Sequence, residues 1–247
     1  MRVRASRQVD HHCPLLMTAI AAAANAAAGA AVAAAVAAAR PGIAYSLGGV
    51  LYLNLTQRCN ATPLHETRGP GFQMPPETGF NVAPSPSGGA PVYRLPLPPG
   101  APEPSAAEAA AVLRTLCATW RPNAPRPPSV VFAGAGEPLL ALQVLLDTLR
   151  LAHCGPGALP FVARVTTNGL FPPAVAWQLR DAGVTRATVA LASAEPRQYA
   201  QLMRPQAEAS GLGLEDVCAF ISALVEAGGA CSRLRSLRAL TRPDACS

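Results

Sequence analysis

Short apolar segments alternate with amphipathic segments along most of this 247-residue chain, and this order constrains the fold more than any other feature. We expect strands at 49–56, 129–133, 161–167 and 186–192, with a last strand between 234 and 240. We expect helices at 105–119, from 138 onward, and at 172–182, 195–203 and 214–227. Short apolar strands separated by helices are typical of a parallel sheet covered by helices. The sequence therefore predicts an α/β fold with parallel strands.

The first 43 residues differ in composition from the rest, and we treat 1–43 as an Ala-rich N-terminal extension and 44–247 as the main domain. Alanine dominates residues 17–39, and because alanine contributes little transfer free energy, a membrane span is not favoured. The arginine-bearing start is compatible with targeting to a plastid or mitochondrion, with disorder or a low-complexity helix as alternatives. Within the main domain, residues 68–104 are rich in proline and glycine and are predicted to be a loop.

Charge and cysteine content limit the partners and the compartment. All 20 basic residues are arginine, and the net charge of +6 is spread thinly along the chain. A nucleic-acid partner is therefore allowed but not indicated, and no feature identifies a protein partner. The seven cysteines are scattered without a C-x-x-C pair, which is typical of reduced thiols in an intracellular compartment, the cytoplasm or an organelle.

Polar and glycine-containing motifs follow directly after the predicted strands. Cys59 follows the first strand, residues 134–138 (GAGEP) the second, residues 167–169 (TNG) the third, and Ser193 the fourth. Ligands of parallel α/β folds bind at the carboxyl ends of the strands. The sequence therefore predicts that these motifs form one site for a small-molecule ligand.

In this order, LNLTQRCN, VVFAGAGEP, RVTTNGL and VALASAEPRQYAQLMRP resemble the radical S-adenosylmethionine (radical SAM) superfamily. The resemblance covers residues 49–227 and implies a partial (β/α) barrel with a [4Fe–4S] cluster after the first strand. It also implies that reductive cleavage of SAM yields a radical that abstracts hydrogen from a substrate. The resemblance makes Cys59 a cluster ligand. It assigns the following residues to cofactor binding: Gly134, Gly136, Glu137, Thr167, Asn168, Ser193 and Arg204.

The chain departs from the family pattern at the cluster loop. The C-x3-C-x2-C motif of the family requires cysteines at positions 63 and 66, where this chain has Pro63 and Glu66. Iron–sulfur clusters are held by thiolates, so we predict that the chain does not hold a conventional [4Fe–4S] cluster. Ala190 and Ala192 stand where the family often has polar side chains, and no sixth strand is evident after Arg242, so the predicted barrel is incomplete.

Each motif also has a purely structural explanation. Cys59 is compatible with a small buried residue, and Gly134 and Gly136 with a tight turn before a helix that begins at Pro138. Glu137 would then only complement the positive N-terminus of that helix. Three hypotheses follow. The first is a radical SAM relative that lost its cluster but keeps a sheet edge that binds SAM or a nucleotide. The second is an active enzyme with an atypical iron–sulfur site, and the third is a non-catalytic binding or interaction protein. No motif identifies a substrate.

Overall fold

The structure is a computed structural model and describes residues 14–64, 66–68, 73–83, 92–94, 102–120, 126–153, 159–206, 209, 211–228, 230–231 and 235–236. Its helices are α1 (Pro14–Ala38), α2 (Ala106–Thr119), α3 (Leu142–His153), α4 (Ala174–Asp181), α5 (Pro196–Met203) and α6 (Leu214–Glu226). Short 3-10 helices lie at η1 (Glu66–Arg68), η2 (Pro76–Thr78) and η3 (Pro138–Ala141). The strands are β1 (Ala44–Leu47), β2 (Val50–Leu53), β3 (Asn81–Ala83), β4 (Val92–Arg94), β5 (Ser129–Phe132), β6 (Val162–Thr167), β7 (Val184–Leu191), β8 (Ala230–Cys231) and β9 (Arg235–Ser236).

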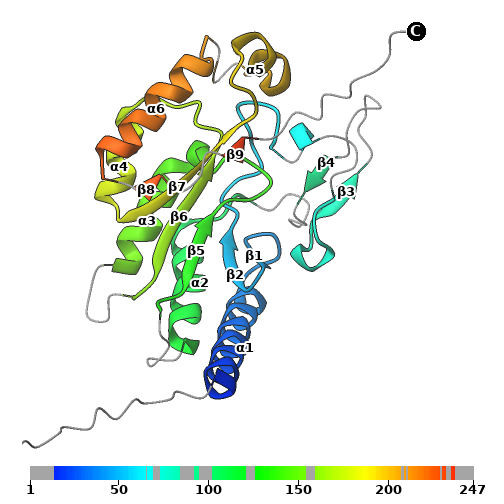
Figure 1. Ribbon diagram of the computed structural model, residues 1–247, viewed down its shortest axis with the longest axis vertical. Coiled ribbons are helices and arrows are strands. Elements are labelled where there is room, and N and C mark those ends of the chain that lie inside the picture. Colours follow the sequence, from blue (N-terminus) through cyan, green and yellow to red (C-terminus); the bar gives the residue numbers. More distant parts are fainter. Residues whose placement is uncertain are drawn as a thin grey trace, which may run out of the picture.

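The main sheet has the order β1-β2-β5-β6-β7-β8, and β9 also pairs with β7. All of its pairings are parallel except that of the edge strand β1, which is antiparallel to β2. The predicted α/β fold with a mostly parallel sheet is therefore confirmed. From β2 to β8 the strands follow chain order, and right-handed crossovers then place the connecting helices on the same face of the sheet. Figure 1 shows α3, α4 and α6 on one side of the sheet and the two-stranded β3–β4 sheet on the other.

Residues along the strands alternate between the two faces of the sheet, as the pleat requires. In β6, Ala163, Val165 and Thr167 are buried, whereas Val162, Arg164 and Thr166 between them are only half-buried. The buried set joins the apolar core that the helices share, formed in part by Leu51, Leu53, Val130, Phe132, Leu113, Leu145, Leu179, Val189 and Phe220. The core thus lies between the sheet and its helices.

Most predicted elements are present, and the differences have local causes. The first strand ends at Leu53, earlier than expected. At the next position, the side chain of Asn54 donates to the Gly42 carbonyl at 3.0 Å and accepts from the Ala135 N–H at 3.1 Å. Strand β1 was not predicted from the sequence, although Gly48 and Gly49, with φ of 58° and 72°, form the glycine turn typical of a tight hairpin. The segment predicted as a loop at 68–104 also contains η2, β3 and β4.

The Ala-rich segment forms α1, and its last turns belong to the shared core. Ala31, Val32 and Ala35 are buried in the same cluster as the residues of α2, and α1 packs against α2. A contribution of this segment to the core was not anticipated from the sequence. Among the described residues, no helix has both the length and the apolar character needed to cross a membrane.

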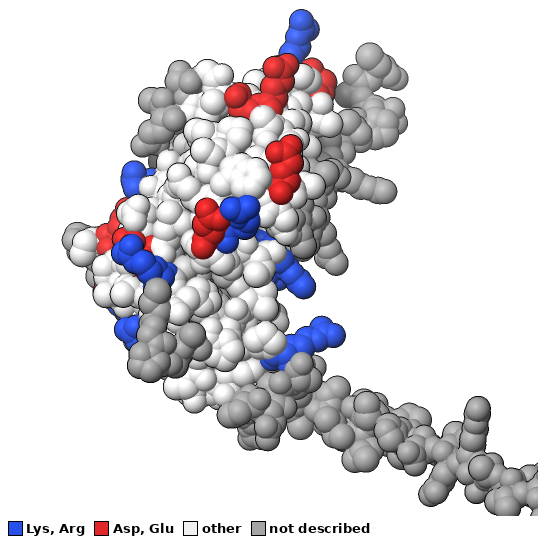
Figure 2. All heavy atoms as spheres, turned by 90° about the vertical axis from the view of Figure 1, so that its left-hand side faces the viewer, with Lys and Arg blue, Asp and Glu red and all other residues white. Residues whose placement is uncertain are grey.

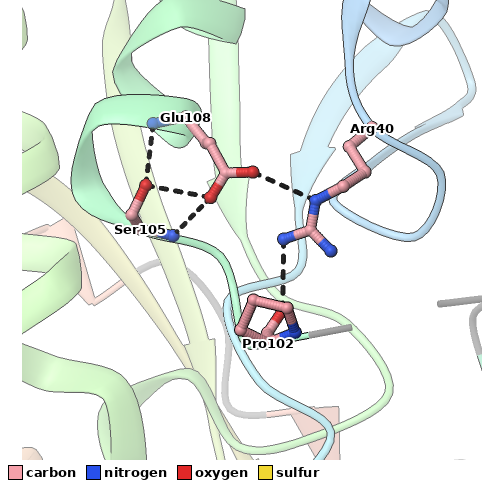
Figure 3. A network of polar contacts seen from close by, with 4 residues as sticks. All are labelled: Arg40, Pro102, Ser105 and Glu108. Carbon is pink, nitrogen blue, oxygen red and sulfur yellow. Dashed lines mark hydrogen bonds and ion pairs between the residues drawn. The ribbon is translucent and has the colours of Figure 1, made fainter. Parts of the chain in front are cut away.

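An ion pair fixes the end of α1 to the beginning of α2 (Figure 3). Arg40 Nε donates to Glu108 Oε1 at 3.0 Å, and a terminal guanidinium nitrogen donates to the Pro102 carbonyl at 3.1 Å. The other carboxylate oxygen of Glu108 accepts from the backbone N–H of Ser105, and the Ser105 hydroxyl accepts from the Glu108 N–H. This reciprocal pair is the predicted capping box, so one glutamate both starts α2 and holds the chain that leaves α1.

Candidate functional site

A buried carboxylate joins the ends of two neighbouring parallel strands. Glu137 follows β5 and is 3% exposed. Its Oε1 accepts hydrogen bonds from the Thr167 hydroxyl at 2.7 Å and the Leu139 N–H at 3.1 Å, while Oε2 accepts from the Asn168 N–H at 2.8 Å. Because Thr167 and Asn168 end β6, Glu137 clamps the carboxyl end of β6 to the turn that follows β5.

A pair of buried asparagines extends this cluster to the loop that follows β2. Asn168 Nδ2 donates to Asn60 Oδ1 at 2.7 Å, and Asn168 Oδ1 accepts from the Leu170 N–H at 3.0 Å. Asn60 Nδ2 donates to the Leu170 carbonyl at 3.3 Å. Sequence reasoning missed Asn60, and its only signal was its position directly after Cys59. The structure therefore brings the cysteine loop, the 134–138 turn and the end of β6 to one edge of the sheet.

Two glycines permit the close approach of these segments. A Cβ on Gly136 would lie 2.3 Å from the Arg58 carbonyl oxygen, and one on Gly134 would lie 1.9 Å from Asn54 Oδ1. The backbone N–H of Glu137 donates to the same Arg58 carbonyl at 2.8 Å. Gly136 is thus explained by close packing against the backbone of the loop after β2, and Gly134 by close packing against the Asn54 side chain.

Cys59 lies at this edge as a half-buried thiol. Burial raises its pKa to about 11, and the negative charges of Glu137 and Glu66 act in the same direction. The thiol is therefore protonated at neutral pH, and Cys59 offers one sulfur where a cluster of the family needs three. Pro63 offers no ligand atom, and the described part of the chain contains no group of three or more His, Cys, Asp or Glu side chains arranged to hold a metal ion. These residues do not fit a conventional [4Fe–4S] cluster.

Ser193 and Arg204 are engaged in the ends of α5. The Ser193 hydroxyl donates to Gln198 Oε1 at 2.6 Å and accepts from the Glu195 N–H at 3.0 Å, and so helps to start the helix. Arg204 has a left-handed backbone, with φ of 45°, and its exposed side chain donates to the Gln201 carbonyl at 3.2 Å. Neither side chain hydrogen-bonds to the Glu137 cluster.

The backbone around Arg204 nevertheless lies beside the cysteine loop. The Thr62 N–H donates to the Met203 carbonyl at 2.6 Å, and the Gln206 N–H donates to the Asn60 carbonyl at 2.8 Å. The segment that matched the LMRP pattern is thus brought to the same edge as the other motifs. We call this edge, formed by the 58–62 loop, the 134–138 turn and residues 167–170, the rim.

Tyr199 is a buried neighbour of the rim that sequence reasoning did not single out. Its side chain is fully buried, and its hydroxyl has no hydrogen-bond partner among the described residues. Burial raises the pKa of this phenol, and the charges of Cys218 and Glu137 raise it further. Tyr199 is the one tyrosine of the amphipathic helix α5, and nothing in the sequence of α5 indicates that its hydroxyl is buried close to a carboxylate.

The buried carboxyl of Glu137 predicts a pH-dependent stability. Burial raises its pKa from 4.5 to about 7, and the hydrogen bonds from Asn168, Thr167 and Leu139 offset only part of this effect. The folded state keeps the proton that the unfolded state loses near pH 4.5. The contribution of the protonated Glu137 to the free energy of unfolding is therefore complete below pH 4.5, and it is lost as the pH rises through about 7. The loss amounts to about 3 kcal/mol.

We expect this loss when urea unfolding of the unsubstituted protein is compared with that of Glu137→Gln between about pH 5 and about pH 8. The glutamine does not titrate, so other carboxyl groups contribute equally to both proteins and cancel in the difference. Parallel stability curves for the two proteins would contradict a raised pKa at Glu137.

Other surfaces differ from the rim in character. An apolar depression lies between α4, β7 and α6, lined by Ala176, Leu179, Arg180, Val184, Arg186, Ala187, Leu224 and Ala227. It contains no residue of the rim. On the side of the molecule shown in Figure 2, acidic and basic side chains are scattered over a mostly uncharged surface, and some of opposite charge lie next to each other. This side of the protein carries no continuous basic surface among its described residues.

In comparisons with known proteins, no protein-family model matches the chain, and no curated protein matches it significantly.

Proposed function

We propose that the chain is a divergent relative of radical SAM proteins that binds SAM or a related nucleotide at the rim without a conventional iron–sulfur cluster. We further propose that its sheet is the partial (β/α) barrel of that superfamily. The sequential order of the parallel strands from β2 to β8 supports the barrel, since a singly wound sheet keeps its helices on one face. The observation that carries the proposal is the Glu137 clamp. It gathers motifs far apart in the sequence at the carboxyl edge of a parallel sheet, where such folds bind ligands.

The rim limits how a ligand is held. The resemblance assigns the SAM amino group to the Gly-Gly-Glu-Pro type of turn, here residues 134–138. Glu137 is buried and its carboxylate accepts three hydrogen bonds from the protein itself. In this proposal the backbone carbonyls of the turn therefore contact the amino group, and Glu137 positions them.

The loop at Cys59 lacks the second and third cysteines of the family motif, and this decides between binding and catalysis. A single cysteine, Cys59, with Pro63 and Glu66 at the other ligand positions, does not supply the three thiolates that such a cluster needs. We therefore propose a binding or regulatory role in place of SAM cleavage.

Titration calorimetry tests the binding proposal. We expect SAM and S-adenosylhomocysteine to bind with dissociation constants between about 1 μM and 1 mM, since the polar positions at 190 and 192 are lost. Glu137→Gln is expected to weaken binding by about tenfold, because the turn loses its hydrogen bond to the Asn168 N–H. Glu215→Gln, at an exposed position of α6, removes the same charge and should leave binding unchanged. Absence of heat at millimolar ligand would remove the nucleotide-binding proposal.

Anaerobic reconstitution with iron and sulfide separates this proposal from an enzyme with an atypical cluster. We expect substantially fewer than about four irons per chain and no electron spin resonance signal of a reduced cluster. About four irons with such a signal would instead support an active enzyme.

A further inference from the structure

Two arginines lie side by side on β6 and β7, and Arg186 also borders the depression between α4, β7 and α6. Arg164 of β6 pairs in register with Arg186 of β7, and paired residues of neighbouring strands point to the same face. The next residues on this face, Thr166 and Thr188, are also paired in register. Val165 and Ala187, which lie between these pairs, point the other way and are buried in the helix-covered core. Arg164, Arg186, Thr166 and Thr188 form the arginine face.

The charges of the arginine face have no counter-charge in the described structure. Neither guanidinium forms a hydrogen bond or an ion pair with any described residue, and Arg164 Nε is buried without a partner. Neighbouring strands are about 4.8 Å apart, so two like charges directly opposite each other are unfavourable. A buried N–H of a cation without an acceptor adds to this cost.

Aromatic and apolar side chains continue the same row toward the other edge of the sheet. On neighbouring strands, Arg164 lies opposite Val131, Val131 opposite Tyr52, and Tyr52 opposite Tyr45. The rings of Tyr45 and Tyr52 stack with centroids 5.0 Å apart, and Phe80 packs edge-on against Tyr45 at 5.2 Å. The row therefore has a cationic end on β6 and β7 and an apolar end on β1 and β2.

We propose that the arginine face binds a small molecule through a phosphate or carboxylate group, which Arg164 and Arg186 hold together. Guanidinium groups form paired, charge-assisted hydrogen bonds with such oxyanions, and one anion between two of them relieves their repulsion. The hydroxyls of Thr166 and Thr188 lie on the same face as additional donors. The apolar body of the ligand packs toward the half-buried Tyr52, beyond the buried Val131. This inference does not depend on whether the rim binds SAM.

Titration calorimetry with inorganic phosphate and with succinate, at constant ionic strength, tests the proposal and distinguishes the two anions. Arg164→Gln is expected to weaken binding of the preferred anion by about tenfold or more, and Arg186→Gln by several-fold, because Arg186 is more exposed. Arg114→Gln, on the exposed surface of α2, makes the same charge change and is expected to alter binding less than about twofold.

Two further variants keep the test decisive if Arg164→Gln does not fold. Arg164→Lys keeps the charge but loses the planar fork and should weaken binding by several-fold. Thr188→Val removes a hydroxyl without changing charge or size and should weaken binding about threefold. Binding of either anion that falls with Arg164 and Arg186 but not with Arg114 supports the proposal. Absence of binding, or an equal loss in all three glutamine variants, would overturn it.

Discussion

Replacing Gly136 with alanine is expected to lower the free energy of unfolding by about 3 kcal/mol or more. The new Cβ would lie 2.3 Å from the Arg58 carbonyl oxygen and 2.6 Å from that of Thr56. Both atoms belong to the backbone of the β2 loop, so no side-chain rotation relieves the contact. The turn must move away from the loop, which breaks the hydrogen bond from the Glu137 N–H to Arg58. Urea unfolding monitored by circular dichroism measures the change.

Gly29→Ala is the matched control for this substitution. Gly29 lies within α1, and an added Cβ there meets no atom within 4 Å. Since alanine favours the helix over glycine, this variant is expected to gain about 0.5–1 kcal/mol. If Gly136→Ala were as stable as the unsubstituted protein, the close approach of the turn to the β2 loop would be wrong.

Elements with strong local signals were predictable from the sequence. Ser105 and Glu108 form the capping box that the spacing predicted, and α2 begins where expected. β5, β6 and α6 also occupy their predicted segments to within about two residues, the usual uncertainty of such boundaries. In each case one short stretch of sequence contains the whole signal.

Features that depend on tertiary packing were not predictable. In α1, 15 of the 25 residues are alanine, so no apolar periodicity distinguishes the buried Ala31 and Ala35 from exposed neighbours. The position of Glu137 at the carboxyl edge of the sheet was predicted, but its burial and its bonds to β6 were not. Asn60 and Tyr199 were missed because the burial of a polar side chain is decided by segments distant in the sequence.

The arginine face shows the same limit. Arg164 and Arg186 are each the one charged residue of their strand, and the sequence alone gives no register between the strands. The irregularity between Ala163 and Arg164 shifts the register, so that Arg164 lies opposite Arg186. A slip of one residue would have placed one of these side chains on the helix-covered face. The paired charges therefore arise from strand register, which only the structure supplies.

Replacing Glu137 with alanine is expected to destabilise the protein by about 3–5 kcal/mol at pH 6. The substitution removes the acceptor for the buried N–H groups of Leu139 and Asn168 and for the Thr167 hydroxyl. A buried donor left without a partner costs about 1–3 kcal/mol, and alanine restores none of the three. Because the clamp holds β6 to the turn after β5, the loss should also loosen the contact between Asn168 and Asn60. The melting temperature should fall by about 6–20 °C.

Glu137→Gln separates the lost acceptor from the lost charge. Glutamine keeps one carbonyl oxygen for Leu139 and Thr167, but its amide nitrogen faces the N–H of Asn168, where two donors meet. We therefore expect a smaller loss at pH 6, about 1–2 kcal/mol. The loss should shrink further above pH 7, where the unsubstituted protein must bury a charged carboxylate and its own stability falls. A Glu137→Ala variant within about 1 kcal/mol of the unsubstituted protein at pH 6 would show that this carboxyl does not hold the rim together.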